Sequence, residues 1–258
     1  MAPALAAGIS VLVAIAAWGA GALTPGGAGA AALVGSSILW STGWPGAAAL
    51  GAFFLSSTLI GRLTEGRAAR SDAQVERRGA RQVLANGAAA ALGGWCSWWA
   101  TGLGLWVVTA SLAAAAADTW ATSMGALSRS DPRSLRDGRR VAPGTSGAVS
   151  GAGTLGGAIG ATIVAAAGAG AARRTDLLWH ATAIGFAGML VDSLLGAWVQ
   201  GRFECPACGE PSERRRHHCG RATRRLKGFA WLDNDGINAL ATTAAALSGI
   251  LAWRLAGG

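Results

Sequence analysis

Three aspartates of the sequence lie within or at the edge of long apolar segments. Asp118 and Asp192 lie inside two such segments, and Asp235 stands at the start of the last one. An ionisable group inside a membrane-spanning helix commonly costs about 2.5–3.5 kcal/mol on insertion scales and usually marks a functional site. Carboxylate oxygens suit Mg²⁺, which takes few protein carboxylates and keeps waters or substrate phosphates. We therefore predict that Asp118, Asp192 and Asp235 bind Mg²⁺.

Other polar residues near these acids are candidates for binding a substrate or nucleotide. They are Asn86, Thr122, Asn234 and Asn238. Thr122 shares a helical face with Asp118, because the two are one turn apart. Asn86, Asp233 and Asp235 could instead cap helices at the membrane interface. Asp118 and Asp192 are harder to explain as caps, so they carry most of the prediction.

A segment rich in glycine and hydroxyl groups, residues 143–151, precedes another apolar segment. Bare backbone N–H groups at a helix N-terminus, together with hydroxyls, form a natural phosphate site. The segment is not a Walker A sequence, because no Gly-Lys-Ser/Thr follows. Its glycines also fit close helix packing in a membrane, which is the alternative. The residues predicted to contact phosphates are Gly144, Thr145, Ser146, Gly147 and Ser150, with the guanidinium group of Arg81.

A cluster of cysteines and histidines lies between the last two apolar segments. A C-x2-C pair, Cys205 and Cys208, is followed by His217 and Cys219, and this set could supply four zinc ligands. His218 could replace His217. A thiolate-rich site in a cytoplasmic loop favours a metal over a disulfide, although redox use or free thiols remain alternatives. We predict a structural Zn²⁺ site, since no open coordination position is implied.

The composition is that of a membrane protein. Only 14% of the 258 residues are charged and 52% are hydrophobic, whereas soluble domains carry about 25% charged residues. The net charge of +9 could suggest a nucleic-acid partner. The basic residues, however, gather in three loops, 62–81, 129–140 and 202–227, and the apolar segments between them are nearly bare. Membrane insertion explains this asymmetry, so we predict a lipid bilayer and no nucleic acid as partner.

We predict an all-α, polytopic bundle in which residues 1–258 form a single transmembrane domain. The eight expected spans are Ala4 to Leu23, Gly27 to Gly43, Pro45 to Gly61, Val83 to Trp98, Trp99 to Ala121, Gly147 to Ala172, Leu177 to Gln200 and Gly236 to Arg254. Six or seven spans remain alternatives, because several of these segments are short. Eight spans place the three basic loops, including the Cys/His loop at about 201–233, in the cytoplasm and both termini outside.

Five motifs of the chain, taken together, resemble a family of integral membrane proteins that includes the phytyl-phosphate kinase of vitamin E synthesis in plants and cyanobacteria. They are residues 81–87 (RQVLANG), 117–122 (ADTWAT), 143–150 (PGTSGAVS), 192–197 (DSLLGA) and 233–238 (DNDGIN). The CPxC…HHCG loop looks like that of some prokaryotic members. Ser123 stands where members commonly have an acid, so this chain would bind metal with fewer charges or have a changed activity.

The resemblance implies a kinase that transfers a phosphoryl group from a nucleoside triphosphate, CTP, to an isoprenyl monophosphate such as phytyl or geranylgeranyl phosphate. In that reaction Asp118, Asp192 and Asp235 would be catalytic and hold Mg²⁺, with Asn86 and Asn238 assisting. The site would face the cytoplasm, in the inner membrane of a prokaryote, and a homo-oligomer is compatible with the sequence. The alternatives are a transporter that uses the buried acids, a prenyl alcohol kinase with Asp118 or Asp192 as base, and a non-catalytic scaffold.

Overall fold

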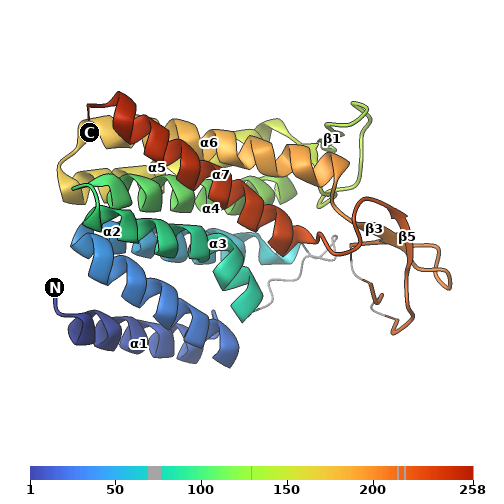
Figure 1. The fold of residues 1–258 in the computed structure, drawn as a ribbon. Helices are drawn as coiled ribbons and strands as arrows, with labels where there is room; N and C mark the ends of the chain where they lie inside the picture. Colours follow the sequence, from blue (N-terminus) through green and yellow to red (C-terminus); the bar gives the residue numbers. More distant parts are fainter. Residues whose placement is uncertain (69–76, 129, 214, 218, 258) are drawn as a thin grey trace.

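The computed structural model describes residues 1–68, 77–128, 130–213, 215–217 and 219–257. Its described part is a bundle of α-helices with a small β-structure at one end (Figure 1). The helices are α1 (Pro3–Gly19), α2 (Pro25–Ala68), α3 (Ala80–Gly94), α4 (Leu103–Ala126), α5 (Gly151–Ala172), α6 (Thr175–Trp198) and α7 (Asn234–Leu255), with a 3₁₀ turn η1 (Trp95–Trp98) after α3.

Helix α2 is broken at Gly43 and doubles back on itself. Gly43 has φ 68° and ψ −156°. This backbone conformation lies outside the helical region, and glycine adopts it more readily than other residues do. A Cβ atom placed on Gly35 would lie 3.8 Å from Leu50 Cδ2, although about 22 Å would separate these two residues along a straight helix. The break predicted between Gly43 and Pro45 is therefore confirmed.

Five helical segments within the described residues are long and apolar enough to cross a membrane: Pro25–Thr64 of α2, α4, α5, α6 and α7. Helix α1 is a shorter apolar helix, and α3 has 15 residues before it continues into η1. The prediction of a helical membrane protein is confirmed at this level. The number of spans stays a prediction.

Helix α4 is the central helix of the bundle. Its residues 106–117 are buried, and it packs against α2, α3, α5, α6 and α7. Small residues make these contacts close: a Cβ on Gly160 of α5 would lie 2.7 Å from the Ala116 carbonyl oxygen, and one on Gly185 of α6 would lie 2.7 Å from Ala113 Cβ. Gly160 and Gly185 thus serve helix packing, as the packing alternative expected for the later glycines, whereas nothing lies within 4 Å of a Cβ on Gly151.

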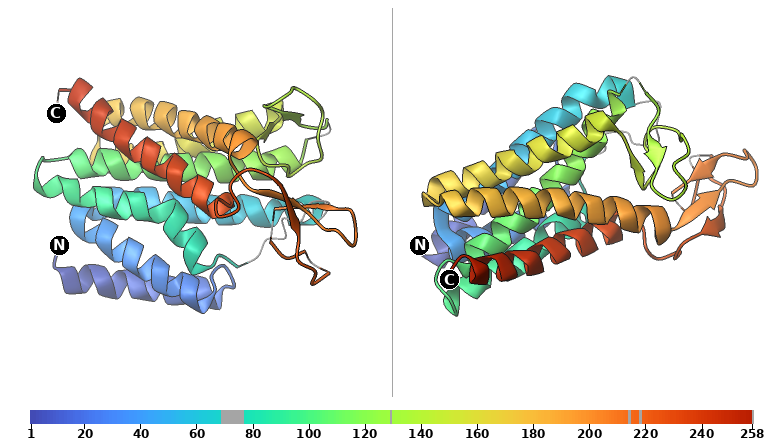
Figure 2. Two further views of the ribbon diagram at one scale, coloured as in Figure 1. Left: turned by 45° about the vertical axis from the view of Figure 1, so that its right-hand side comes forward. Right: turned by 90° about the horizontal axis from the view of Figure 1, so that it is seen from above.

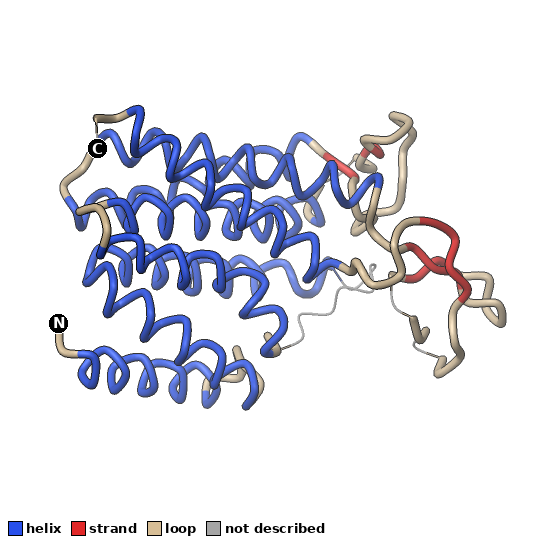
Figure 3. The backbone as a smooth tube through the Cα atoms, in the orientation of Figure 1, coloured by secondary structure: helices blue, strands red, loops and turns tan. Residues whose placement is uncertain are grey.

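The loops at one end of the bundle contain short antiparallel strands, which the all-α prediction missed. Strands β1 (Arg133–Ser134) and β2 (Ala148–Val149) pair with each other, and β3 (Arg202–Glu204), β4 (Pro211–Ser212) and β5 (Arg224–Lys227) form a sheet in the order β4-β3-β5. Figure 3 shows these strands in red beside the helices. Strands of two to four residues are too short to show an alternation of apolar and polar residues, so they could not be predicted from the sequence.

The described parts of the three basic loops lie at the end of the bundle that holds the strands, and both termini lie at the opposite end (Figures 1 and 2). Contacts between the loops agree with this arrangement. The Arg78 backbone pairs with residues 22–24 of the α1–α2 connection, and the Ser146 backbone binds Glu213 of the third loop. The expected grouping of the basic loops on one side is therefore observed. Which side of a membrane this end faces stays a prediction.

Candidate functional site

Asp118 of α4 and Asp192 of α6 lie close enough inside the bundle for their carboxyl groups to interact. Asp192 is 9% exposed, and its Oδ2 atom has no hydrogen-bond partner. Among the described residues, no lysine or arginine forms an ion pair with either acid. Two such carboxylates cannot both remain ionised unless a cation compensates them. The pair therefore suits a shared proton or a divalent cation.

Two of the three predicted asparagines, Asn86 and Asn238, are buried in helices that pack against α4. Asn238 of α7 is 6% exposed, and its Oδ1 atom has no hydrogen-bond partner in the described structure. Asn86 of α3 is 7% exposed and donates from Nδ2 to the Gln82 carbonyl oxygen at 3.1 Å. Helices α3 and α7 are joined by a hydrogen bond from Thr242 Oγ1 to the Ala85 carbonyl oxygen at 3.0 Å. The free oxygen of Asn238 is a second unsatisfied acceptor that a donor or cation would stabilise.

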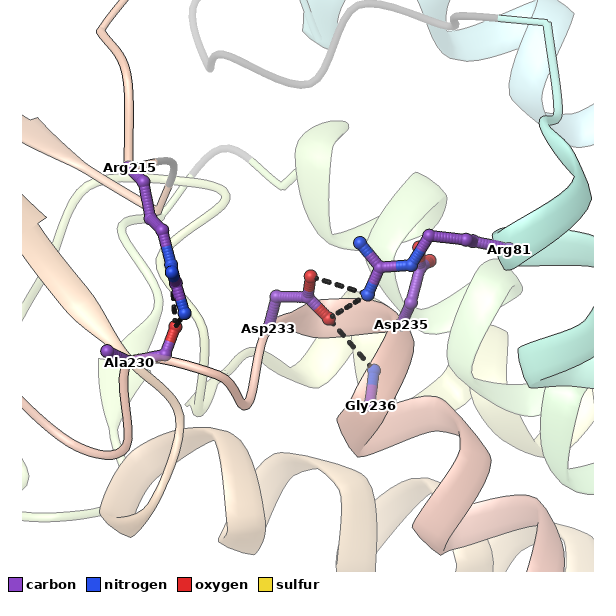
Figure 4. A network of polar contacts seen from close by, with 6 residues as sticks. All are labelled: Arg81, Arg215, Ala230, Asp233, Asp235 and Gly236. Carbon is purple, nitrogen blue, oxygen red and sulfur yellow. Dashed lines mark hydrogen bonds and ion pairs between the residues drawn. The ribbon is translucent and has the colours of Figure 1, made fainter. Parts of the chain in front are cut away.

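Asp233 and Asp235 belong to a different network, which Figure 4 shows. Arg81 Nη2 donates to both carboxylate oxygens of Asp233, at 2.9 and 3.2 Å, and Arg81 Nε lies 3.9 Å from Asp235 Oδ2. Asp233 Oδ1 also accepts from the Gly236 N–H at 3.1 Å and so caps α7. The cap alternative is thus confirmed for Asp233. In the described part of the chain, no contact joins Asp235 to Asp118 or Asp192.

The glycine-rich segment packs against the same ends of α4 and α6. A Cβ on Gly147 would lie 2.4 Å from Ala197 Cα, and one on Gly196 would lie 3.1 Å from Gly147 N. Gly196 is one turn beyond Asp192. On the α4 side, a Cβ on Gly125 would lie 3.6 Å from Ser150 Oγ, two turns beyond Asp118. The segment and the acid pair therefore occupy the same end of the bundle.

Ser146 already binds an anionic group in this structure. Its backbone N–H and its hydroxyl donate to Glu213 Oε1 at 3.2 and 2.5 Å, and Gln200 Nε2 donates to Glu213 Oε2 at 3.2 Å. The other hydroxyls are used locally, since Ser150 Oγ caps α5 through the Gly153 N–H and Thr145 Oγ1 donates to the Ala142 carbonyl oxygen. A carboxylate oxygen of Glu213 thus accepts the two hydrogen bonds that Ser146 was predicted to donate to a phosphate.

The structure adds basic residues that the sequence analysis did not single out. Arg202 donates to the Ser146 carbonyl oxygen, and Lys227 Nζ donates to the Ala197 carbonyl oxygen at 3.0 Å. Burial, together with the nearby charges of Arg202 and Arg136, lowers the pKa of Lys227. These cations make the surroundings of Ser146 electropositive. Only their positions in space reveal this, because basic residues are common throughout the loop.

Other predicted positions are more exposed. Thr122 is exposed on α4, Ser123 is half-buried, Gly144 is exposed, and Asn234 is exposed at the start of α7. Arg81 has a side chain that is 73% exposed. These residues line the loop end of the bundle and are accessible from outside the helices.

The four predicted zinc ligands do come together. One ligand atom from each of Cys205, Cys208, His217 and Cys219 lies within 4.8 Å of all the others. His218 lies outside the described residues. Cys96 is in η1, between α3 and α4, and is not one of these ligands.

Comparisons with known proteins agree with this architecture. The family model Integral membrane protein DUF92 matches residues 8–246. Protein PGR of Arabidopsis thaliana is 28% identical over 244 residues, covering 81% of this chain and 82% of that protein. An uncharacterized membrane protein of Methanocaldococcus jannaschii is 32% identical over 167 residues, covering 64% of this chain and 69% of that protein. No solved structure matches significantly. The match to the family model confirms the resemblance to an integral membrane family that the motifs indicated, and the protein belongs to the Integral membrane protein DUF92 family.

Proposed function

We propose that this protein is a membrane-embedded kinase that transfers a phosphoryl group from a nucleoside triphosphate, CTP, to an isoprenyl monophosphate such as phytyl or geranylgeranyl phosphate. The observation that carries the proposal is the pair of half-buried Asp118 and buried Asp192, beside a loop segment whose Ser146 already binds a carboxylate. A cation site and an anion site at one end of a helical bundle are the parts that phosphoryl transfer needs.

Asp118 and Asp192 would hold Mg²⁺, and the ion would neutralise charge on the phosphates that meet there. The unpaired oxygens of Asp192 and Asn238 fit this donor set, because Mg²⁺ prefers oxygen ligands. Asp235, the third acid of the prediction, would have to leave the 3.9 Å contact with Arg81 to join them. Half-buried Ser123 offers a hydroxyl where related proteins have an acid.

The phosphates would be bound by the Ser146 N–H and hydroxyl, by the neighbouring glycine-rich backbone, and by Arg81 and Lys227. Each of these groups donates hydrogen bonds and favours negative charge. A monophosphate acceptor is already ionised at neutral pH, so the transfer requires positioning and charge neutralisation but no general base. Asn86 and Asn238 would orient the acceptor from the α3–α7 side.

The prenyl chain would lie against the lipid-facing side of α6 and α7. A shallow groove of about 260 Å³ runs between these helices, lined by Ala183, Ile184, Ala187, Gly188, Val191, Ala244, Ala245 and Ser248. Its lining is almost entirely apolar, and Val191 is next to Asp192 in the chain. A prenyl chain in this groove would bring the phosphate at its end toward Asp118 and Asp192.

The orientation completes the proposal. Eight spans with both termini outside would place the strand-containing end in the cytoplasm, where the nucleotide is available and where basic loops are favoured. The site would then take its nucleotide from the cytoplasm and its isoprenyl phosphate from the bilayer.

A phosphoryl-transfer assay tests the proposal. The purified chain, in detergent or nanodiscs with Mg²⁺, is given CTP labelled at the γ-phosphate and phytyl or geranylgeranyl phosphate, and the labelled diphosphate is separated. Transfer is expected to the monophosphate and not to the prenyl alcohol. Asp118→Asn and Asp192→Asn should each lower it by about 100- to 1000-fold. Asp176→Asn is the matched control, because Asp176 lies at the other end of α6 and pairs with Arg174 at 2.6 Å.

Two results would overturn the proposal that the protein is a kinase. One is no transfer by the wild-type chain from any nucleoside triphosphate. The other is full transfer by both Asp118→Asn and Asp192→Asn. Transfer to the alcohol would point instead to a prenyl alcohol kinase, in which one of the two acids acts as a base.

A further inference from the structure

The Cys205–Cys219 region forms two tight turns that face each other. The first turn holds Cys205 and Cys208 and is closed by a hydrogen bond from the Gly209 N–H to the Cys205 carbonyl oxygen at 2.8 Å. The second turn holds His217 and Cys219 and is closed by a hydrogen bond from the Gly220 N–H to the His217 carbonyl oxygen at 2.9 Å. Both glycines have φ in the left-handed region, 69° and 82°. Each turn thus presents two side chains toward the same point.

The separations of the four side chains fit tetrahedral coordination. Cys205 Sγ lies 3.6 Å from Cys219 Sγ, and His217 Nδ1 lies 3.1 Å from Cys219 Sγ. Zinc–sulfur bonds of about 2.3 Å place two tetrahedral sulfur ligands about 3.8 Å apart. All four cysteines of the chain are free thiols. A disulfide would use only two of the four groups and would leave the other two without a reason to converge.

The histidine is oriented as a ligand would be. His217 is 4% exposed, and while its Nδ1 faces the sulfur atoms, its Nε2 lies 3.1 Å from Glu210 Oε2. A carboxylate that accepts the N–H of the outer nitrogen fixes the tautomer that leaves the inner nitrogen free to bind a metal. Three thiolates and one Zn²⁺ would leave a charge of −1, which the arginines of this loop, among them Arg215, Arg221 and Arg224, would compensate.

The segment that joins the two turns contains Glu213, the residue that binds Ser146. Glu213 lies between the two pairs of sulfur and nitrogen ligands in the chain. Next to it, β4 pairs with β3, and Arg215 donates to the Ala230 carbonyl oxygen at 2.9 and 3.1 Å. Figure 4 shows this Arg215 contact near the Arg81–Asp233 pair. A metal that joins residues 205 and 219 would therefore fix the ends of the loop that holds Glu213.

We propose that Cys205, Cys208, His217 and Cys219 bind one structural Zn²⁺, and that this metal holds Glu213 on the backbone N–H and hydroxyl of Ser146. The zinc site stands without the proposed kinase activity. The contact between Glu213 and Ser146 is likewise independent of that activity. Only its importance for phosphate binding rests on the proposed function.

Metal analysis of the purified full-length chain tests the site without any activity assay. The protein is isolated through a tag that binds no metal, and zinc is measured by mass spectrometry. One zinc ion per chain is expected, with loss to less than about a tenth in Cys208→Ser and Cys219→Ser. Cys96→Ser is the matched control and should keep the full content. Cobalt substitution should give the visible absorption of a tetrahedral thiolate site, which the Cys219→Ser protein should lack.

The link to Ser146 is tested by hydrogen exchange of the peptide that contains this residue. Removing zinc with a chelator should speed exchange of the Ser146 amide, since its acceptor Glu213 is released. Glu213→Gln should leave the zinc content unchanged and weaken protection of the same amide. A chain that carries no zinc and gains none when zinc is added, or that carries iron, overturns the zinc site. If the Ser146 amide exchanges at an unchanged rate in both the chelated and the Glu213→Gln proteins, the proposal that the metal holds Glu213 on Ser146 is wrong.

Discussion

Two pairs of aspartates lie at the same end of this bundle, and their surroundings differ. Asp233 and Asp235 stand at the start of α7 beside Arg81, and Asp233 also caps the helix. Asp118 and Asp192 lie between α4 and α6 with no cationic partner among the described residues, and one oxygen of Asp192 has no hydrogen bond at all. The first pair is explained by helix geometry. The second pair destabilises the fold unless something else binds to it.

This difference indicates where the chemistry lies. A residue that stabilises its helix needs no further reason to be present, whereas a buried acid without a partner is retained for what it binds. We therefore propose that Asp118 and Asp192 form the reactive centre, whereas Asp233 has a structural role as the cap of α7.

The largest expected effect separates the two pairs by activity. Asp118→Asn or Asp192→Asn should lower phosphoryl transfer by about 100- to 1000-fold, the cost of removing one group that stabilises developing charge. Asp233→Asn should lower it by less than about tenfold, because its acceptor oxygen remains. Rates of labelled diphosphate formation check this. Equal losses in Asp192→Asn and Asp233→Asn would remove the distinction.

The same substitution should have the opposite effect on stability. Asp192→Asn should raise the melting temperature of the metal-free protein or leave it unchanged, because it removes a buried acid that lacks a cationic partner. Thermal unfolding in detergent, followed by a thiol-reactive dye or by circular dichroism, measures this. A clear drop in melting temperature would mean that Asp192 is a structural residue.

The segment beside the reactive pair should be sensitive to one added methyl group. Gly147→Ala should destabilise the protein by about 1–3 kcal/mol, because Gly147 has φ 74° and its Cβ would lie 2.4 Å from Ala197 Cα. Gly151→Ala is the control, since nothing lies within 4 Å of a Cβ there. Chemical denaturation compares the two. Similar stabilities would show that the segment does not pack on α6 as described.

The cap at the other pair should have a smaller effect. Asp233→Ala should lower stability by about 1 kcal/mol through loss of the hydrogen bond to the Gly236 N–H. Asp233→Ser should restore most of the loss, because serine is also a good cap. If serine fails to do so, the carboxylate acts through its charge and not as a cap.

The ion pair at the surface should matter least. Arg81→Gln should change stability by less than about 1 kcal/mol, because the Arg81 side chain is 73% exposed and exposed ion pairs contribute little. Any effect on stability should shrink at high salt. A weaker affinity for the nucleotide with unchanged stability would support the phosphate contact proposed for Arg81.

The sequence was sufficient for the features that depend on local chemistry. Acids within apolar runs pointed to Asp118 and Asp192, and the spacing of the cysteines pointed to the four convergent zinc candidates. The placement of the three basic loops at one end followed from their alternation with apolar segments. These features need only hydropathy, charge and short spacing.

Other features depend on contacts between distant residues, which spacing cannot supply. Arg81 pairs with Asp233, 152 residues away, and Asp235 is thereby drawn toward Arg81. Glu213 is one acid in a basic loop, and nothing in its neighbourhood identifies Ser146, 67 residues earlier, as its partner. The short strands form where each loop folds back on itself, β1 on β2 in one loop and β3 on β4 and β5 in the other, and no residue pattern within either loop marks them.

Binding of a divalent cation tests the central claim most directly. Mn²⁺, a paramagnetic substitute for Mg²⁺, is titrated into the purified chain after zinc analysis, and free Mn²⁺ is followed by electron paramagnetic resonance. The account predicts one site that is lost in Asp118→Asn and in Asp192→Asn and is retained in Asp233→Asn. Binding that survives both of the first two substitutions, or that disappears only with Asp233→Asn, would contradict it.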